Sequence, residues 1–250
     1  MDAGRRYRLA GKRIWARAFE QNNRNILSAL MARAPIESLL DLGCDDGERT
    51  TRWANAAGAR SVHGVETVAS RAQLALERGI SVTTADLGAP LPFDDGSFDA
   101  VVSNQVIEHL FDTDLFLAEA FRVLRPGGVI VTSTENLASW HNVAALLLGW
   151  QPFSLTNVSS IDAIGNPMGL MVGGDLAHPV PGSVTLQHRR VFATRGLVAL
   201  HRAHGFVAVD CRGAGYYPLP RKLGVVNPAH AAFITAVGQR ERRRANVPAP

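Results

Sequence analysis

The sequence predicts an α/β fold with a doubly wound, mostly parallel sheet of seven strands and a last antiparallel strand. Apolar segments of strand length alternate with amphipathic segments of helix length between residues 38 and 133, which is typical of a parallel sheet. Residues 39–48 add a second indication, because an apolar run stops at Gly43 and Gly47 and a helical stretch follows. Glycines let the backbone turn sharply, and N–H groups at a helix start point toward a ligand. This segment therefore predicts a nucleotide-shaped socket after the first strand.

The elements of the first half follow one another in order. Its predicted strands are short apolar runs over residues 38–42, 61–65, 80–84, 98–103 and 129–133. Amphipathic helices are expected between them over residues 49–57, 69–78 and 114–124. The last of these helices meets Arg125-Pro126-Gly127-Gly128, a stop signal because proline and glycine do not continue a helix.

Residues 136–190 depart from this alternation and are rich in Gly, Ser, Asn and Pro. They are predicted to be an insertion after strand five, over the sheet edge, with one apolar stretch at 143–150. Regularity returns with a helix from Thr194, the expected N-cap, to Gly205, the expected stop. The remaining two strands are expected over residues 206–209 and 232–237.

Composition narrows the class of protein. No apolar run approaches the roughly 20 residues that a membrane-spanning helix needs, and the first residues lack the apolar stretch of a signal peptide. We therefore expect a cytoplasmic protein. The two cysteines, Cys44 and Cys211, give no disulfide framework. Both are expected to be structural, since Cys44 lies in the glycine turn where a small side chain is wanted.

The net charge of +4 comes largely from basic residues near the two ends of the chain. These are Arg5, Arg6, Arg8, Lys12, Arg13, Arg240, Arg242, Arg243 and Arg244. Such clusters can bind the phosphates of nucleic acid or acidic lipid. The tail is short, however, and has no interleaved aromatic residues to stack on bases. The sequence therefore favours solvated, fraying termini over a nucleic-acid site.

Ligands of open parallel sheets bind at the carboxyl ends of the strands. The first strand supplies small and acidic residues there, namely Asp41, Gly43, Cys44, Asp45 and Gly47. The second strand ends in Glu66, whose carboxylate can accept two hydrogen bonds from a ribose diol. The third leads to Asp86 and Leu87, which suit an adenine amino group and ring. Asn104 and Gln105 follow the fourth strand, where the backbone would border the reactive end of a ligand.

Two kinds of nucleotide ligand can be distinguished at the turn. A dinucleotide-binding turn has the pattern G-x-G-x-x-G, whose second glycine lets a pyrophosphate approach. Here Asp45 and Glu48 occupy the positions of the second and third glycines. Two carboxylates would repel a pyrophosphate but could face a cationic amine or sulfonium. The sequence thus favours a ligand with adenine, ribose and an amino-acid tail but no phosphate.

Several motifs stand at consistent distances along the chain. They are Asp-Leu-Gly-Cys-Asp-Asp-Gly at 41–47, Gly64-Val65-Glu66, Ala85-Asp86-Leu87, Leu-Pro-Phe-Asp-Asp-Gly-Ser-Phe-Asp at 91–99, Glu108-His109-Leu110 and Arg-Val-Leu-Arg-Pro-Gly-Gly at 122–128. Together they resemble the class I S-adenosylmethionine-dependent methyltransferases, the broad group typified by the ubiquinone and menaquinone methyltransferases. The resemblance spans residues 36–135 and departs at Asp45, where the family usually has a third turn glycine.

The resemblance implies a Rossmann-like fold and S-adenosylmethionine as cofactor. It also implies that the glycine turn holds the methionine part, Glu66 the ribose hydroxyls, and Asp86 with Leu87 the adenine, while Asn104 lies by the methyl group. The implied reaction is in-line methyl transfer to a nucleophile, for which alignment can contribute about 7 to 11 kcal/mol. A base is needed only if the acceptor must lose a proton.

We expect one methyltransferase domain, because 250 residues with 46% hydrophobic content are enough for one sizeable core. Its expected parts are an N-terminal helical cap (1–35), a cofactor-binding core (36–135), a substrate-side insertion (136–190), the C-terminal part of the sheet (191–240) and a basic flexible tail (241–250).

Four residues are candidate bases: His109, His141, His188 and Glu135. His109 follows the fourth strand and is either catalytic, a structural residue of the turn or a cofactor contact. His141, beside Trp140, is either a base or an ordinary residue of the insertion. His188 anchors the insertion in the simpler interpretation, and Glu135 either orients a substrate or is a solvated loop carboxylate. Their spacing demands no metal, so none is expected.

The insertion is expected to carry the substrate specificity, since loops over a rigid scaffold usually do. Its apolar residues form either a lid over a hydrophobic acceptor or a helix packed on the core. They are Leu146, Leu147, Leu148, Trp150 and Phe153. Tyr216 and Tyr217 are further candidates for the lining of the same opening.

Three functions are compatible with these features. The first is a small-molecule methyltransferase, monomer or homodimer, that acts on a hydroxyl of a metabolite or sugar-containing precursor. The second is an RNA or other nucleic-acid methyltransferase. Against it, the fourth strand is followed by Asn104-Gln105-Val106 and not by an Asn-Pro-Pro-Tyr motif, and Cys211 lies away from where an attacking thiol is expected. The third is a cofactor-binding protein without turnover, because Asp45 departs from the family and no base is unambiguous.

Overall fold

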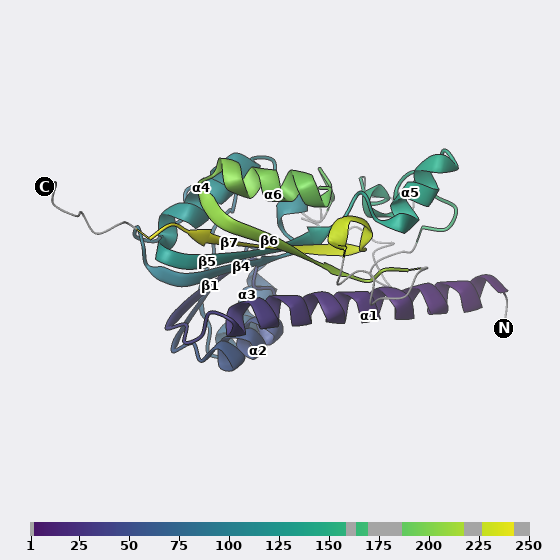
Figure 1. Ribbon diagram of the computed structural model, residues 1–250. Coiled ribbons are helices and arrows are strands. Elements are labelled where there is room, and N and C mark those ends of the chain that lie inside the picture. Colours follow the sequence, from purple (N-terminus) through teal and green to yellow (C-terminus); the bar gives the residue numbers. More distant parts are fainter. Residues whose placement is uncertain (1–2, 159–163, 170–186, 218–226, 243–250) are drawn as a thin grey trace, which may run out of the picture.

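The computed structural model describes residues 3–158, 164–169, 187–217 and 227–242. These residues form a seven-stranded sheet with helices on both faces, in three layers (Figure 1). The strand order is β3-β2-β1-β4-β5-β7-β6, so the winding reverses between β1 and β4. β7 runs antiparallel to both of its neighbours, whereas the other pairs are parallel. The predicted doubly wound α/β class is confirmed.

The strands are β1 (Ser38–Leu42), β2 (Ser61–Val65), β3 (Ser81–Thr83), β4 (Phe98–Asn104), β5 (Leu124–Glu135), β6 (Phe206–Ala214) and β7 (Phe233–Arg240). The α-helices are α1 (Ala3–Met31), α2 (Glu48–Ala57), α3 (Ala69–Glu77), α4 (Thr113–Val123), α5 (Trp140–Leu147) and α6 (Thr194–Ala203). Short 3-10 turns are η1 (Ile107–His109), η2 (Phe153–Leu155) and η4 (Pro228–His230). The bounds of β1 and β2 agree with the prediction.

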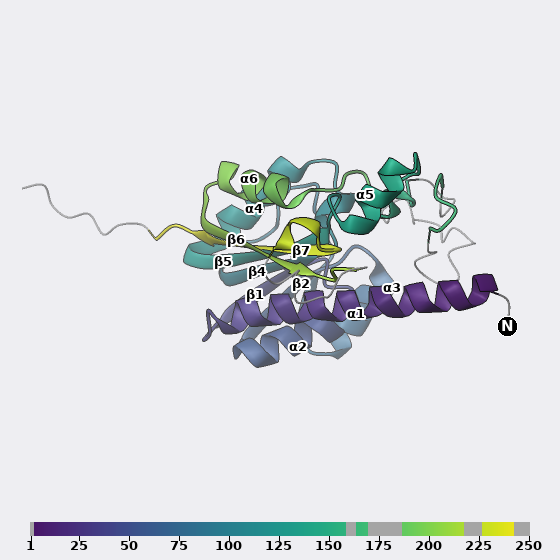
Figure 2. The same cartoon turned by 45° about the vertical axis from the view of Figure 1, so that its right-hand side comes forward.

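Helices α1, α2 and α3 cover one face of the sheet, and α4 and α6 cover the other (Figures 1 and 2). On the first face, Ile26 and Leu30 of α1 pack with Trp53 of α2 against the strands. On the second face, Phe116 and Phe206 belong to the larger apolar cluster. Among the described residues, no helix is long and apolar enough to cross a membrane.

The end of α4 differs from the prediction. The helix stops at Val123, and β5 begins at the very next residue, so Arg125-Pro126-Gly127-Gly128 lies inside the strand range. The stretch is accommodated as an irregularity, since the β4–β5 register shifts between Phe98 and Ala100. Prolines and glycines at a strand end are tolerated at such bulges. The stop signal was therefore correct for the helix, whereas the strand's start was predicted too late.

The C-terminal elements are also longer than predicted, and the α6 N-cap is Ala193 rather than Thr194. The Thr194 hydroxyl instead donates a hydrogen bond to the carbonyl of Pro228, 3.3 Å away. Gly205 does follow the helix with a φ of 84°, as expected of a stop.

Arg240 does not belong to a fraying basic terminus. Its guanidinium donates hydrogen bonds to the carbonyls of Phe121, Arg122 and Leu124, at 2.8, 3.0 and 2.6 Å. It also lies 4.7 Å from the centre of the Phe121 ring. A cation at the carboxyl end of α4 satisfies the last carbonyls of the helix. The prediction of solvated termini is wrong for this residue, and residues 243–250 lie outside the described part.

Two hollows of about 520 and 350 Å³ open at the amino ends of the strands, next to Arg125. They involve residues such as Ser38, Arg60 and Gly127 rather than the residues at the carboxyl edge. Because ligands of parallel sheets bind at the carboxyl ends of the strands, we expect the functional site at the opposite ends of the strands from these hollows.

Candidate functional site

The parallel strands β1, β2 and β4 bring their carboxyl ends to one edge of the sheet. The first turn at this edge follows β1, where Gly43 and Gly47 have φ angles of 89° and 79°. A Cβ on Gly43 would lie 2.5 Å from Val106 Cγ2, and one on Gly47 would lie 2.6 Å from Ile80 Cδ1. Both positions therefore require glycine, for conformation and for space.

Glu66 ties this turn to the next unit of the sheet. One carboxylate oxygen accepts a hydrogen bond from the Asp45 N–H at 3.0 Å, and the other accepts from the Val68 N–H at 2.8 Å. The backbone of Gly43 and Cys44 also donates to the carbonyl of Val65. The carboxylate is held in place by both turns, and each oxygen keeps a further lone pair for a ligand.

Asp45 adopts the left-handed conformation, with a φ of 51°. Aspartate is one of the few non-glycine residues that tolerate this region, which explains how it replaces a turn glycine. Its carboxylate is paired with Arg71 of α3 and lies 4.0 Å from Arg49. Two arginines that the sequence did not point to thus compensate the negative charge with which Asp45 was expected to face a cationic ligand.

Asp41 and Cys44 lie buried beneath the turn. One Asp41 oxygen accepts a hydrogen bond from Thr50 at 2.5 Å, and the other has no partner among the described groups. Burial raises the pKa of Asp41 to about 7, against the lowering effect of the Thr50 bond. Burial likewise raises the pKa of the Cys44 thiol to about 12, which leaves it protonated. Cys44 is therefore a packing residue, as expected.

Asp86 and Leu87 follow β3 at the same edge. Asp86 is exposed, and one of its oxygens accepts a hydrogen bond from the Gly88 N–H at 2.8 Å. Leu87 is buried and belongs to the large apolar cluster under the sheet edge. The pair therefore offers an oriented carboxylate next to an apolar surface.

Asn104, at the end of β4, contacts a helix that the sequence did not connect with the site, whereas Gln105 contacts Ser133 of β5. The Asn104 side chain accepts a hydrogen bond from Asn22 of α1 at 3.1 Å. The Asn22 oxygen in turn accepts from the hydroxyls of Ser133 and Thr235, each at 2.9 Å. A fully buried asparagine thus joins α1 to three strands. The adjacent pair Asn22-Asn23 in an otherwise charged helix was the available signal.

A second group of residues lies beyond β4, on η1 and a distant segment. His109 Nδ1 is 3.2 Å from the carbonyl of Gln187, and its ring centre is 4.9 Å from that of His188. Burial, followed by the charge of His188, lowers the pKa of His109 to about 4. His188 Nδ1 lies 2.7 Å from the carbonyl of Ser154 and 3.9 Å from a Glu135 oxygen. The fold thus brings three of the four candidate bases into one neighbourhood.

Glu108 was predicted only as part of a motif, yet it is fully buried beside these histidines. Burial raises the pKa of Glu108 to about 8; the charge of Glu135 adds to this and the Thr134 hydroxyl opposes it. The only signal in the sequence was the position of Glu108 next to His109 in the motif, because burial of a carboxylate is not visible in a sequence.

His141, on α5, has different neighbours from His109. Its ring stacks on Tyr217 with centres 5.0 Å apart and meets the edge of Phe153 at 5.4 Å. Burial lowers the pKa of His141 to about 4, and burial together with the charge of Glu135 raises that of Tyr217. Trp140 stacks on His230, so α5 and the C-terminal part of the chain share an aromatic wall.

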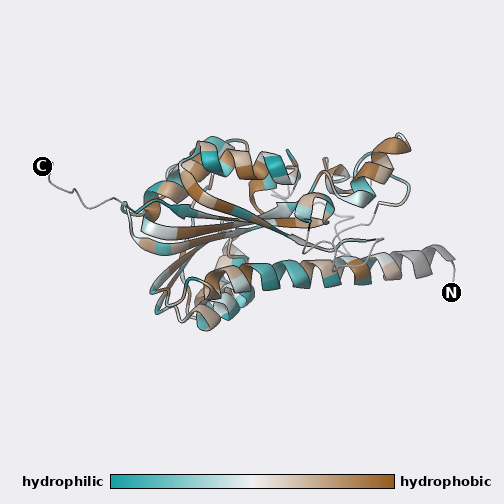
Figure 3. Ribbon diagram, viewed as in Figure 1, coloured by the Kyte–Doolittle hydropathy of each residue, from teal (hydrophilic) through white to brown (hydrophobic). Residues whose placement is uncertain are grey.

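The apolar end of α5 is open to solvent. Leu146, Leu147 and Leu148 are 54, 83 and 61% exposed, and Figure 3 shows the apolar colour at the far end of the helix. The expected alternative in which these leucines pack on the core is therefore wrong. Much of the predicted insertion, residues 159–163 and 170–186, lies outside the described residues.

The chain was compared with known protein families. Residues 40–132 match the family described as a methyltransferase domain. This stretch is similar to methyltransferase domains. The domain contains the glycine turn, Glu66, Asp86 and His109, and it ends before Glu135 and α5.

The relatives of this methyltransferase domain agree with that assignment. A protein of Mycolicibacterium smegmatis named "Probable S-adenosylmethionine-dependent methyltransferase" is 37% identical over 131 residues, which are 51% of this chain and 48% of that protein. The malonyl-[acyl-carrier protein] O-methyltransferase of Erwinia billingiae is 34% identical over 134 residues, or 52% and 50% of the two chains. The chain thus spans about half the length of these curated relatives.

The fold extends further than the sequence match. A crystal structure from Thermotoga maritima, described as an S-adenosylmethionine-dependent methyltransferase and possible histamine N-methyltransferase, superposes with a TM-score of 0.57. It is 20% identical and covers 93% of this chain and 96% of its own. The similarity in fold therefore extends beyond residues 40–132 to most of the chain.

Proposed function

We propose that this chain is an S-adenosylmethionine-dependent methyltransferase that acts on a hydroxyl of a small-molecule acceptor. The turn of residues 41–47, tied by its backbone to Glu66, is the observation that carries the proposal. Gly43 and Gly47 let this turn pack closely against Val106 and Ile80, which fixes the backbone at the α2 N-terminus. The relatives that are named as S-adenosylmethionine-dependent enzymes and as an O-methyltransferase support it.

The residues at the turn fit this cofactor. Glu66, with both oxygens oriented by backbone N–H groups, can accept hydrogen bonds from the two ribose hydroxyls. Asp86 and Leu87 can take the adenine amino group and ring. The free oxygen of Asp41 and the backbone of Gly43 to Gly47 lie on the methionine side, and Asn104 with Gln105 lies toward the methyl group.

When bound, S-adenosylmethionine supplies an electrophilic methyl group on a positively charged sulfur. The chain's own residues must then hold the acceptor in line with it, which can contribute about 7 to 11 kcal/mol. Burial keeps His109 and His141 neutral at pH 7, so each can accept a hydrogen bond from the acceptor hydroxyl. We propose these two histidines as the residues that contact the acceptor.

The acceptor is proposed to have an apolar part. Phe153 and Tyr217 flank His141, and the exposed leucines of α5 stand next to this wall. An apolar acceptor would cover such leucines and remove them from water, at about 25 cal/mol per Å² of buried area. We therefore propose that these leucines form the apolar lid that the sequence predicts.

Cofactor binding is tested first, by calorimetric titration of the chain with S-adenosylmethionine. The wild-type chain and the Gly58→Ala variant are expected to bind it. Gly58 also has a positive φ, but a Cβ there would meet nothing within 4 Å, so it is a matched control. Gly43→Ala, whose Cβ would meet Val106, is expected to lose binding. Absence of binding by the folded wild-type chain would contradict the proposal.

The acceptor class is tested with the tritiated methyl group of S-adenosylmethionine. Label is expected in a small-molecule extract and not in total RNA. Transfer to RNA would overturn the small-molecule assignment, and binding without transfer to either fraction would favour a cofactor-binding protein without turnover.

A further inference from the structure

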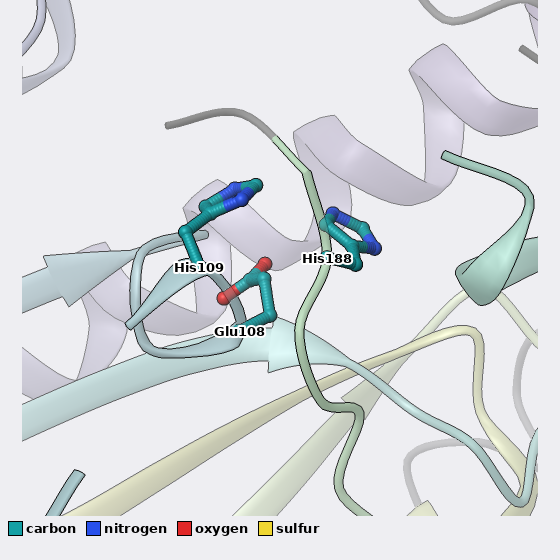
Figure 4. Close-up of side chains that lie close together, drawn as sticks. All are labelled: Glu108, His109 and His188. Atoms are coloured by element: carbon teal, nitrogen blue, oxygen red, sulfur yellow. The ribbon is translucent and has the colours of Figure 1, made fainter. Parts of the chain in front are cut away.

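Glu108, His109 and His188 form a compact cluster, although His188 lies far along the chain from the other two. One potential ligand atom from each side chain lies within 4.8 Å of the other two. Glu108 and His109 come from η1, and His188 comes from the segment that returns before α6. Figure 4 shows the Glu108 carboxylate below and between the two imidazole rings.

The Glu108 side chain is buried without a cationic partner among the described residues, and the nearby Thr134 hydroxyl and the Glu108 backbone favour its charged form. It is 0% exposed, and neither carboxylate oxygen has a hydrogen-bond partner among the described groups. The neighbouring arginines form no ion pair with Glu108 among the described residues: Arg189 donates to the carbonyl of His109, and Arg190 donates to the carbonyl of Phe111 while its Nε is buried without a partner. A buried carboxylate without a partner is costly, and proteins normally pair such groups or coordinate a metal with them.

The two histidines present their ring nitrogens in a matching way. Nδ1 of His109 and Nδ1 of His188 each lie against a backbone carbonyl, at 3.2 and 2.7 Å. A carbonyl only accepts, so Nδ1 carries the proton and Nε2 keeps its lone pair. Histidines that bind metals commonly donate their second N–H to a carbonyl in this manner.

We propose that Glu108, His109 and His188 bind a divalent transition-metal ion such as Zn²⁺, Mn²⁺ or Fe²⁺. Two imidazole nitrogens and one carboxylate are a donor set that such ions favour. Bond lengths of about 2.0 to 2.2 Å would draw the ligand atoms closer together than in the present structure. Three protein ligands leave coordination positions open to water or to an oxygen of a bound molecule.

The position of this metal site indicates a role in activating the acceptor, an inference that rests on the proposed function. Glu135, at the end of β5, lies 3.9 Å from Nδ1 of His188, so the cluster adjoins the part of the edge proposed for the acceptor. A metal ion there would hold an acceptor hydroxyl and make its proton easier to lose. In that role, His109 acts on the acceptor through the metal ion, which replaces the direct contact proposed for His109 above, and His141 keeps its direct contact.

Metal binding is tested on the chain without a histidine tag and without S-adenosylmethionine. Co²⁺ is added as a spectroscopic probe, and its visible absorption reports nitrogen and oxygen ligation; Zn²⁺ binding is then measured by calorimetry. The wild-type chain is expected to bind one equivalent of each ion. Glu108→Gln and His188→Gln are expected to weaken binding by tenfold or more.

His230→Gln is the matched control. His230 Nδ1 also lies against a backbone carbonyl, that of Ala138 at 2.7 Å, but His230 is not part of the cluster. This variant is expected to bind Co²⁺ and Zn²⁺ like the wild type. Circular dichroism and S-adenosylmethionine binding in the presence of EDTA identify variants that fail to fold.

Absence of one-equivalent Co²⁺ and Zn²⁺ binding by the folded wild-type chain would overturn the metal site. Wild-type affinity in folded Glu108→Gln would overturn it as well. Because metal and cofactor are titrated separately, a chain that binds metal but not S-adenosylmethionine would contradict the proposed function and leave the metal site standing.

Discussion

The two halves of the carboxyl edge are built in different ways. The cofactor half, residues 41–47, 66 and 86–87, is a set of backbone turns in which glycines are fixed by φ and by space. The acceptor half, the part proposed for the acceptor, is built from segments that are distant along the chain, residues 108–109, 135–153 and 187–188. It combines buried side chains with the exposed leucines at the end of α5. The cofactor half lies inside the matched methyltransferase domain, and most of the acceptor half lies outside it. The site proposed for the cofactor thus depends on local backbone geometry, whereas the site proposed for the acceptor depends on long-range packing.

The sharpest test of the cofactor half is Gly47→Ala compared with Gly58→Ala. Both positions have positive φ, which costs an alanine about 1 to 2 kcal/mol. Only at Gly47 would the new Cβ also meet Ile80 and the Ala75 backbone, at 2.6 and 3.0 Å. Overpacking adds about 1 to 3 kcal/mol there, so we expect a total loss of about 4 kcal/mol at Gly47. Equal losses in urea unfolding of the two variants would contradict a turn that is fixed by space.

The acceptor half and the layer under it contain buried neutral histidines, which predicts loss of stability in acid. Burial lowers the pKa of His201 to about 4, with Nε2 2.9 Å from the Thr132 hydroxyl. The unfolded pKa is near 6.5, so the unfolded chain binds the proton first as pH falls. The contribution is full above about pH 6.5 and disappears toward pH 4.

For His201 this acid effect is on the order of 3 kcal/mol by pH 4, and about 2 kcal/mol of it is already lost at pH 5, since each pKa unit corresponds to about 1.4 kcal/mol. His109 and His141 shift in the same direction. Urea unfolding at pH 8 and pH 5 measures the loss, and His201→Gln should show a smaller difference between the two. A variant that loses as much stability as the wild type would refute this role of His201.

Glu66→Gln tests whether a carboxylate is required in the cofactor half. Both Glu66 oxygens accept hydrogen bonds from backbone N–H groups. The amide nitrogen of glutamine cannot accept a hydrogen bond, so one of these two bonds would be lost. Hydrogen bonds to charged groups contribute about 1.5 to 3 kcal/mol, so we expect S-adenosylmethionine affinity to fall at least tenfold by calorimetry. The exposed Glu48 of the same turn is the control, and Glu48→Gln should bind within twofold of the wild type. Similar losses in both variants would indicate a general charge effect instead.

The smallest effect is expected for Asp45→Gly. The Asp45 carboxylate is already paired with Arg71, and glycine readily adopts the positive φ of this position. S-adenosylmethionine affinity should change by less than threefold in the same titration. A loss of tenfold or more would mean that the Asp45 charge acts on the cofactor despite its arginine partners.

Local sequence patterns were enough to predict the elements that depend on neighbouring residues. The apolar runs of β1 and β2, the glycine turn and Glu66 lie where the pattern predicted them, because strand periodicity and glycine conformation are properties of neighbouring residues. The same reasoning recovered α2, α3 and α4 to within one residue at each end.

Which charges are paired and which are buried depends on how distant segments pack in three dimensions, and the sequence did not predict it. The sequence suggested that Asp45 faces a cationic ligand, whereas its carboxylate is paired with Arg71, 26 residues away. Glu108 was one letter of a motif, and it becomes a buried carboxylate beside two histidines only when the segment at His188 returns to η1. Desolvation and ion pairing depend on distances between segments that are remote along the chain, so no local pattern records them.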